Sequence, residues 1–241
     1  MNNHSQALSH AAVRTAVAML GILATLSAGR AFSANAILSN EVRLGMYFVN
    51  YSPHADDISG PYVPPGVNLD VNKVSTPYAA YIRRLAPHFV LELAVGVPPV
   101  TKTIGKGPAT LGSVPYAGQV ISTARWYAPT LLVNYVFRDE SATLRPYVGA
   151  GVNFLHFANR QSTPAGDAAN GGPTSLALTN SLGPAVSAGL SWRLKERWHA
   201  YISYDYARVD SDLVANTAGV LRRTSIHFNP TTVVVSLGYA F

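Results

Sequence analysis

The sequence predicts an all-β fold, an eight-stranded antiparallel transmembrane β-barrel with an up-and-down meander. Three observations support this prediction: large apolar and small or polar residues alternate in recurring segments, short and long connections alternate between these segments, and charged residues are rare. Hydrophobic residues make up 48% of the 241 residues and charged residues only 12%, about half the charged share of an ordinary soluble domain. Much of the surface is therefore expected to face something other than water.

The last nine residues, VVVSLGYAF, show the alternation most clearly. Large apolar or aromatic side chains share one parity, at Val233, Val235, Leu237, Tyr239 and Phe241. Small side chains and one valine share the other, at Val234, Ser236, Gly238 and Ala240. Successive side chains of a strand point to opposite faces, so one face is large and apolar and the other is narrow. Because an unpaired terminal strand frays, this strand is expected to be paired along its whole length.

Seven earlier segments repeat this pattern, and the weakest of them is 74–82. The segments are 42–48, 74–82, 89–97, 131–137, 148–154, 186–192 and 198–206. Short turns are expected at 84–88, 138–143 and 195–197, and long loops at 52–69, 98–118, 158–180 and 209–225. Eight strands of about 9 to 11 residues, with all tight turns at one end, describe a small transmembrane β-barrel. The short turns and both ends of the mature chain are then expected at the periplasmic rim.

A soluble barrel or sandwich has the same period and would place the apolar face inside. The opposite face argues against it, because Gly45, Gly96 and Gly149 fit the tight interior of a barrel better than a solvated exterior. Trp192 and Trp198 beside one short turn also suit the aromatic girdle of a membrane interface. The pattern therefore favours the membrane protein.

Residues 1–36 read as a cleaved secretory signal peptide, which leaves 37–241 as the barrel. A basic start at His10–Arg14 precedes the apolar run Ala16–Ala28, and Ala34-Asn35-Ala36 forms an A-x-A cleavage signal. An uncleaved anchor helix is the alternative, but the apolar run is shorter than the roughly 20 residues that span a bilayer. After residue 36 no stretch is continuously apolar for long enough to predict a helical span.

The residues give little support for metal, cofactor or nucleic-acid binding. The chain has no cysteine, and its dispersed histidines show no metal-ligand spacing; they are His54, His88, His156, His199 and His227. We therefore predict no metal site and no cofactor. The basic residues form no stripe that would bind nucleic acid.

His199, Ser203 and Asp205 share one strand face and are the residue types of a hydrolytic triad. His199 and Ser203 lie roughly 13 Å apart along a strand, too far for a nucleophile and its base. We predict no catalytic residues, although a partner on a neighbouring strand, such as His227, stays an alternative.

The inward parity predicts the residues that line the lumen. They are Arg43, Tyr47, Glu92, Asn134, Arg145, Asn153, Tyr201 and Asp205. Buried charges need partners, so Glu92 and Asp205 are expected to pair with Arg43, Arg145 or Arg193. An eight-stranded interior is either filled by side chains or holds one small ligand, which excludes a wide aqueous pore.

Four stretches carry a resemblance to a known family. They are APTLLVNYVF (128–137), LRPYVGAGVNF (144–154), GPAVSAGLSW with RWHAYISYDYARVDSDL (183–213), and NPTTVVVSLGYAF (229–241). Together they resemble the OmpW family of outer-membrane proteins over essentially the whole mature chain. The family commonly shows a proline followed shortly by a histidine after the third strand, whereas VPPVTKTI here has Lys102 and no histidine.

The resemblance implies a barrel in the bacterial cell outer membrane, surrounded by outer-membrane lipid, that passes small hydrophobic molecules. The terminal Phe241 resembles the signal read by the barrel-assembly machinery. The long loops mix proline with apolar residues, which suits a vestibule for apolar solutes. A structural or surface-binding barrel, adhesin-like or receptor-like, is the alternative function.

Three prolines near the upper ends of strands, Pro98, Pro99 and Pro129, are candidates for a lateral opening because each removes a ladder donor. Ordinary strand termination is the alternative explanation. We expect a monomer.

Overall fold

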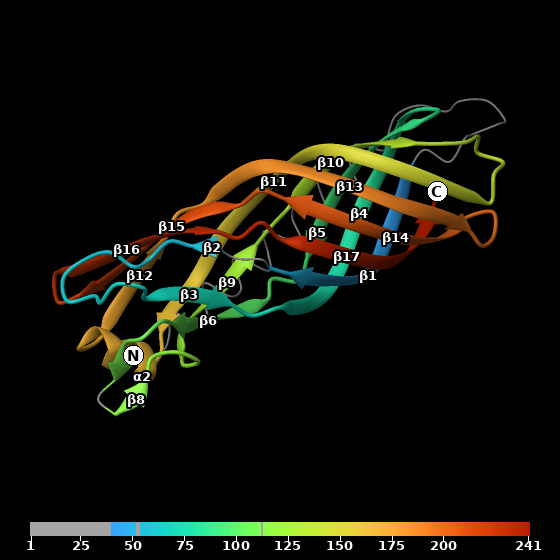
Figure 1. Ribbon diagram of the computed structural model, residues 1–241. Coiled ribbons are helices and arrows are strands. Elements are labelled where there is room, and N and C mark those ends of the chain that lie inside the picture. Colours follow the sequence, from blue (N-terminus) through green and yellow to red (C-terminus); the bar gives the residue numbers. More distant parts are fainter. Residues whose placement is uncertain (1–39, 52–53, 112) are drawn as a thin grey trace, which may run out of the picture. The chain divides into compact units, whose positions relative to one another are not determined.

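The computed structural model describes residues 40–51, 54–111 and 113–241, and it confirms the all-β barrel (Figure 1). These residues form one compact unit. The predicted signal peptide, 1–36, lies outside the described residues. Eight strands build the barrel: β1 (Asn40–Asn50), β4 (Val74–Ala86), β5 (Phe89–Gly96), β10 (Thr130–Val136), β11 (Leu144–Ser162), β13 (Ser181–Arg193), β14 (Trp198–Ala207) and β17 (Thr231–Ala240).

Hydrogen bonding closes these eight strands into a ring. Their order is β10-β5-β4-β1-β17-β14-β13-β11, and β10 also pairs with β11. Every pairing in the ring is antiparallel. Closure matters in a membrane because lipid offers no hydrogen-bond partners to the backbone groups of an open edge. Among the described residues, no helix is both long and apolar enough to cross a membrane.

The terminal strand is paired over its whole length, as predicted. β17 pairs with β1 on one side and with β14 on the other. Beyond the strand, the amide of Phe241 donates to the carbonyl of Asn40 over 2.8 Å. The last residue of the chain is therefore tied to the first residues of the barrel.

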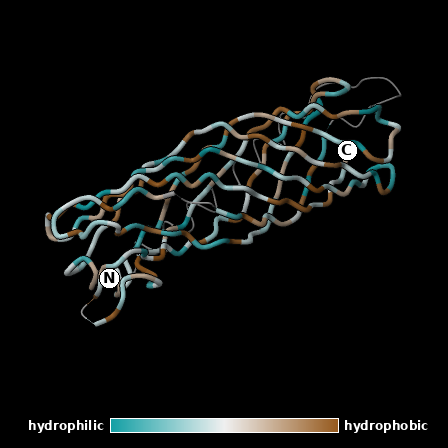
Figure 2. Tube along the Cα trace, viewed as in Figure 1, coloured by the Kyte–Doolittle hydropathy of each residue, from teal (hydrophilic) through white to brown (hydrophobic). Residues whose placement is uncertain are grey.

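The two faces of each strand alternate as the sequence predicts. On β1, Leu44 exposes 63% of its surface and the adjacent Arg43 only 5%. On β10, Val133 exposes 44% and Asn134 is completely buried. Figure 2 shows hydrophobic and hydrophilic residues alternating along the barrel strands. The apolar parity thus faces outward, toward lipid, and the mixed parity faces the lumen.

Exposed aromatic residues gather beside the turn between β13 and β14. Trp192 and Trp198 flank this turn and are both exposed. The ring of Trp198 packs edge-on against Tyr239, with 5.1 Å between the ring centroids. These rings form part of the predicted girdle at the end of the barrel that carries the short turns.

The four long connections, expected as loops, contain further strands. These are β2 (His54–Ala55), β3 (Asn68–Val71), β6 (Val100–Lys106), β7 (Thr110–Leu111), β8 (Val114–Pro115), β9 (Val120–Tyr127), β12 (Thr174–Leu178), β15 (Asp210–Thr217) and β16 (Val220–His227). β11 alone has 19 residues, a length of about 60 Å, whereas the apolar band of such barrels is roughly 25 Å tall. The expectation of irregular loops was wrong because the strands continue beyond the membrane, where lipid no longer imposes an apolar outer face.

Beyond the membrane the wall divides into two sheets, which lie toward the left of Figure 1. One sheet joins β3, β6 and β9 to β11, and the other has the order β12-β15-β16-β2. A short helix, α2 (Pro164–Asn170), follows β11; its N-cap residue Thr163 accepts the amide of Gly166 over 3.1 Å, and Gly171 ends it at a φ of 83°. These two sheets and α2 are called the outer extension below.

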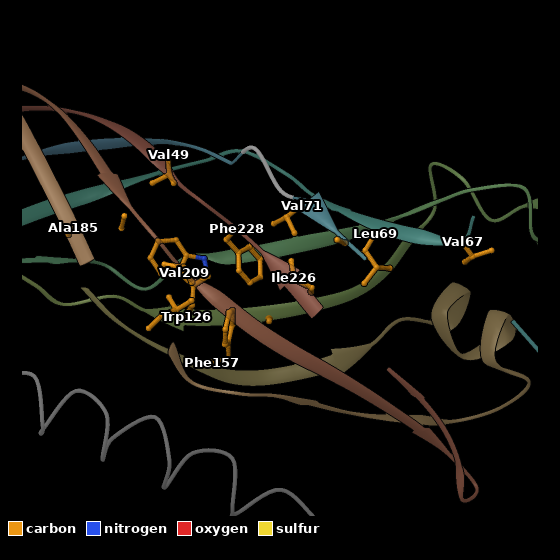
Figure 3. Packing of buried hydrophobic residues seen from close by; sticks show 14 of the residues in the cluster. Val49, Val67, Leu69, Val71, Trp126, Phe157, Ala185, Val209, Ile226 and Phe228 are labelled. Carbon is orange, nitrogen blue, oxygen red and sulfur yellow. The ribbon is translucent and has the colours of Figure 1, made fainter. Parts of the chain in front are cut away.

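The largest apolar cluster joins the barrel interior to the outer extension. Its barrel members include Val49, Leu132 and Ala185, and its extension members include Val71 and Ile226. Figure 3 shows Trp126, Phe157 and Phe228 at the centre of this cluster; the rings of Phe157 and Phe228 lie 5.7 Å apart. The interior toward the outer extension is therefore lined by apolar side chains.

Candidate functional site in the barrel lumen

The lumen has two parts of opposite character. The lower lumen is the interior near the short turns, and it contains Glu41, Arg43, Glu92, Asn134 and Tyr201. The upper lumen is the interior toward the outer extension, and it contains Val49, Leu132, Leu155, Ala185 and Ala207. All ten of these side chains belong to buried residues of the barrel strands.

Arg43 is the centre of the lower lumen. Its Nε lies 3.0 Å from Glu41 Oε1, and one terminal nitrogen lies 3.2 Å from Glu92 Oε2. The guanidinium carbon also stacks 3.6 Å from the ring centre of Tyr201, close enough for a cation–π interaction. Arg43 thus bridges two carboxylates from different strands, and the expected pairing of Glu92 with Arg43 is confirmed.

The remaining carboxylate oxygens of the lower lumen are also hydrogen-bonded. Tyr78 donates its hydroxyl to Glu92 Oε1 over 2.8 Å, and Asn134 donates its amide to Glu92 Oε2 over 2.8 Å. Tyr201 donates its hydroxyl to Glu41 Oε2 over 2.9 Å. A buried network with its charges paired is rigid and costly to break.

A glycine makes room for this network. A Cβ at Gly149 would lie 1.8 Å from the side-chain oxygen of Asn134, so any larger residue would displace the amide that bonds Glu92. This close approach explains why small residues share the inward parity, as the sequence pattern predicts.

Asp205 does not have the arginine partner that was expected. Its Oδ2 accepts a hydrogen bond from Ser203 Oγ over 3.0 Å, and none of the ion pairs among the described residues includes it. Arg145 instead donates to the carbonyl of Arg138 over 3.3 Å. Arg193 donates to the carbonyls of Glu140 and Ser141 in the same turn. These two arginines lie at strand ends near the short turns, so the expected pairing of Asp205 with an arginine was wrong.

An apolar cavity of about 100 Å³ occupies the upper lumen. Its apolar lining includes Val49, Tyr51, Leu132, Leu155, Ala185, Ala207, Val209 and the rings of Trp126, Phe157 and Phe228. Four residues of the predicted lumen lining, Tyr47, Glu92, Asn153 and Asp205, also border it. Asn153 is held by a 2.7 Å hydrogen bond from its amide to Thr130 Oγ1. The cavity therefore has apolar walls with a small number of polar groups, the usual composition of a small-molecule site.

A second cavity, of about 370 Å³, lies within the outer extension. Residues of both sheets line it, among them Leu69 and Ser122 from one sheet and Leu213 and Thr224 from the other. Both cavities border on the same apolar cluster. An apolar lining thus extends from the outer extension into the upper lumen.

The ladder of hydrogen bonds in the wall is interrupted at Pro98 and Pro99. The β4–β5 pairing ends at Tyr78 and Gly96, and the pairing of the next strands upward, β3 and β6, resumes at Val71 and Thr103. In the described chain no strand pairing or backbone hydrogen bond joins 73–76 to 98–101. A single backbone bond, from Val97 to the carbonyl of Pro77, and one from Asn72 to Lys102 mark the two edges of this interruption.

Pro129 has a different position. The amide of Phe154 donates to the carbonyl of Pro129 over 3.0 Å, and the pairing of β11 keeps its register from β10 to β9 across this proline. Pro129 therefore removes one donor from a seam that is otherwise continuous. Of the three candidate prolines, Pro98 and Pro99 coincide with a longer break.

Among the residues of these sites that the sequence does not single out are Glu41, Tyr78 and Pro77. Glu41 has the same parity as Arg43, two residues away, so the period of β1 could have identified it. Tyr78 and Pro77 lie in the weakest of the eight patterns, where no inward face was assigned. Their roles depend on the register between strands, which a single sequence does not show.

The residues considered for catalysis are not brought together as a triad. His199 Nδ1 lies 3.3 Å from Glu41 Oε2, while Ser203 donates to Asp205. No group of three His, Cys, Asp or Glu side chains suited to a metal ion occurs in the part of the chain that the structure describes.

A closed eight-stranded antiparallel barrel with an apolar outer face defines an outer-membrane barrel protein. The model of the OmpW family matches residues 109–241. The chain belongs to the OmpW family, and its place is the bacterial outer membrane.

Curated relatives agree with this assignment. The chain is 29% identical over 143 residues to outer membrane protein W of Vibrio cholerae, covering 59% of this chain and 63% of that protein. It is 31% identical over 121 residues to outer membrane protein W of Escherichia coli, covering 50% and 56%. The matched region thus spans less than two thirds of each of these relatives.

Solved structures show the same fold. The crystal structure of OprG from Pseudomonas aeruginosa matches with a TM-score of 0.76 at 20% identity, over 84% of this chain and 95% of that one. The solid-state NMR structure of AlkL in lipid bilayers matches with a TM-score of 0.61 at 20% identity, over 88% and 95%.

Proposed function

We propose that this barrel admits small hydrophobic molecules from outside the cell, holds them in the upper lumen and releases them sideways into the outer membrane. One observation supports this function above the others: the apolar cavity ends below on the hydrogen-bonded lower lumen and borders the interrupted ladder at its side. Passage of small hydrophobic molecules is also what the resemblance to the OmpW family implies.

A straight path through the barrel would oppose an apolar solute. In the lower lumen Arg43, Glu92 and Asn134 are buried and bonded to one another. A solute that entered this region would have to separate these groups without offering hydrogen bonds in return, which costs several kcal/mol. The apolar walls of the upper lumen are the more favourable environment.

The side of the barrel offers an alternative exit. Ala94 and Thr101 line the cavity on either side of Pro98 and Pro99, so the cavity borders the interruption from within. On the outer face, Val97 and Val100 are exposed at the same level. An apolar solute could therefore pass from the apolar cavity to lipid where few backbone hydrogen bonds must open.

Binding and passage account for the lumen better than catalysis does. His199 lies beside Glu41, and Ser203 donates to Asp205, so His199 and Ser203 do not form the nucleophile–base pair that hydrolysis requires. We further propose that the lipid-surrounded barrel is a monomer and that the assembly machinery recognises β17 with Phe241.

The first experiment compares uptake of a fluorescent hydrophobic probe by cells with and without the protein. We expect uptake to fall severalfold on deletion. Unchanged uptake would reject passage and favour the structural or surface-binding barrel.

The second experiment tests the sideways exit with Pro98→Val combined with Pro99→Val. Valine restores two backbone donors and a preference for strand pairing, so the seam is expected to close and uptake to fall. Pro129→Val is the matched control, because it adds one donor to a seam that is already continuous, and its effect is expected to be smaller. If the double variant reaches the surface in normal amounts and takes up probe at the normal rate, release does not occur at this seam.

A further inference from the structure

The position of Asp205 at the boundary between the two halves of the lumen indicates which solutes the cavity prefers. Asp205 is on β14, opposite Ser187 of β13 and Thr232 of β17. It borders the apolar cavity together with Ala185 and Ala207. A carboxylate therefore lies at the floor of an otherwise mainly apolar site.

The other carboxylate of the cavity floor already has its partners. Glu92 accepts hydrogen bonds from Tyr78, Arg43 and Asn134, which occupy both of its oxygens. Its charge is compensated by the guanidinium of Arg43. Glu92 is thus part of the closed network of the lower lumen and is not available to a ligand.

Asp205 differs from Glu92 in charge and in hydrogen bonding. Among the described residues no arginine, lysine or histidine forms an ion pair with it. One oxygen accepts from Ser203, while the other, Oδ1, is buried and has no hydrogen-bond partner. A carboxylate removed from water is unfavourable unless a donor or a cation compensates it. The barrel supplies only serine hydroxyls, from Ser203 and from Ser187 on the facing strand, and no paired cation, so a bound molecule could supply the missing charge.

We infer that the cavity prefers small apolar molecules that carry one protonated amine, with the amine at Asp205 and the apolar body against the walls of the upper lumen. This inference rests on one part of the proposed function, namely that the solute occupies the cavity of the upper lumen. A cavity of about 100 Å³ suits a single ring or a short chain, since an engineered cavity of about 150 Å³ holds benzene. Asp205 is then a specificity-determining residue, and the same cavity disfavours carboxylates.

The test compares three probes that share one ring and differ in charge: benzylamine, benzyl alcohol and benzoate. Binding to the full chain in lipid nanodiscs is measured by equilibrium dialysis, and empty nanodiscs correct for partition into lipid. We expect benzylamine to bind about tenfold or more tightly than benzyl alcohol, because both can donate a hydrogen bond to Asp205 but only the ammonium group also compensates its charge. Benzoate is expected to bind most weakly.

The variant Asp205→Asn keeps the shape of the side chain and removes its charge. It is expected to abolish the preference for benzylamine, while benzyl alcohol, whose hydroxyl can donate to the amide oxygen instead, loses far less affinity. Asp210→Asn is the matched control, because Asp210 lies on β15, is exposed and does not border the cavity; it should keep the preference. Equal loss of both ligands in Asp205→Asn would overturn the inference.

Two further comparisons cover the remaining outcomes. Heat-modifiable migration on gels shows whether Asp205→Asn folds. If it does not fold, the ranking of the three probes on the unaltered protein is the test, and equal binding of benzylamine and benzyl alcohol overturns the inference. Cells that take up an uncharged probe normally while the purified protein shows no amine preference would reject this inference and leave the proposed function standing. Loss of amine preference and unchanged uptake on deletion together would reject both.

Discussion

The lower and upper lumen share one wall and differ in almost everything inside it. Both are enclosed by the same eight strands, with the same alternation and the same apolar outer face. In the lower lumen Arg43 and Glu92 form a paired network, whereas in the upper lumen Leu132 and Ala185 leave an apolar cavity. The comparison shows that the membrane requires apolar residues at the outward-facing positions of every strand. The inward-facing positions are not restricted in this way, so they form a closed polar network at one end and an apolar cavity at the other.

The largest expected effect is a loss of stability when the charge-paired network of the lower lumen is broken. Replacing Arg43 by methionine keeps much of the side-chain volume but leaves Glu41 and Glu92 buried without a counter-ion. We expect a loss of about 3 to 5 kcal/mol in the free energy of unfolding, measured by urea denaturation in lipid vesicles. Arg145→Met is the control, because the side chain of Arg145 is only half-buried and donates to a carbonyl near the turn. Equal losses in both variants would mean that the lower lumen is not a charge-paired seal.

The second prediction concerns the wall that both halves share. Arginine at the outward Val133, in the middle of β10, is expected to destabilise the inserted barrel by about 2 to 4 kcal/mol, and arginine at the outward Leu190, two residues from Trp192 of the girdle, by less. Ser187 is buried at an inward-facing position of β13. Arginine there should reduce membrane insertion less and disturb the packing inside the barrel more. Folding yield into vesicles measures both effects, and equal damage would contradict the contrast between faces.

The third prediction concerns the upper lumen. Ala185→Phe places a ring in the apolar cavity, so we expect uptake of a hydrophobic probe to fall severalfold, with a cost in stability of about 1 to 3 kcal/mol for overpacking. Ala188→Phe is the matched control on the same strand, because Ala188 is exposed on the lipid-facing parity. Normal uptake by the Ala185 variant would show that solutes do not use this cavity.

The wall was predictable from the sequence because its cause is local. Lipid on one side imposes a period of two on every membrane-spanning segment, and β1 or β17 shows it without reference to any other strand. In the outer extension this constraint ends, and a stretch such as Thr101–Thr103 carries polar side chains on both faces. Strands there are held by pairing with their neighbours and show no period of two, so the sequence alone predicts loops.

The lumen was predictable only in part, because parity fixes a side chain's direction and not its height in the barrel. Parity correctly places Arg43 and Glu92 inside the barrel. It does not decide which of the inward arginines pairs with Glu92. Asp205 was placed inside as well, but Arg145 and Arg193 lie near the short turns, at strand ends. Which inward charges meet depends on the stagger of eight strands, a property that no single segment contains.

The smallest expected effect contrasts the buried ion pairs of the lower lumen with an exposed one on the outer extension. Asp210 Oδ1 accepts from His227 Nδ1 over 2.6 Å, and Oδ2 accepts from Arg208 Nε over 3.1 Å. The hydrogen bond from His227, together with Arg208, holds the pKa of Asp210 below its ordinary value. A carboxyl group with a lowered pKa stabilises the folded state above its unfolded pKa, about 4, and this contribution is lost as the pH falls through the folded pKa.

Because Asp210 is exposed, water and salt screen this interaction, and we expect it to contribute only a few tenths of a kcal/mol. Acidification from about pH 6 to about pH 3 should therefore weaken the β15–β16 pairing slightly, and Asp210→Asn should remove that part of the pH dependence. Hydrogen exchange of the β15 and β16 amides, corrected for its intrinsic dependence on pH, measures the change. Asp212→Asn is the control, since Asp212 is also exposed on β15 but accepts from the hydroxyl of Ser225. If Asp210→Asn lowered the stability as much as is expected for Arg43→Met, burial would not explain why one ion pair matters more than the other. The contrast between the lower lumen and the exposed surface would then be wrong.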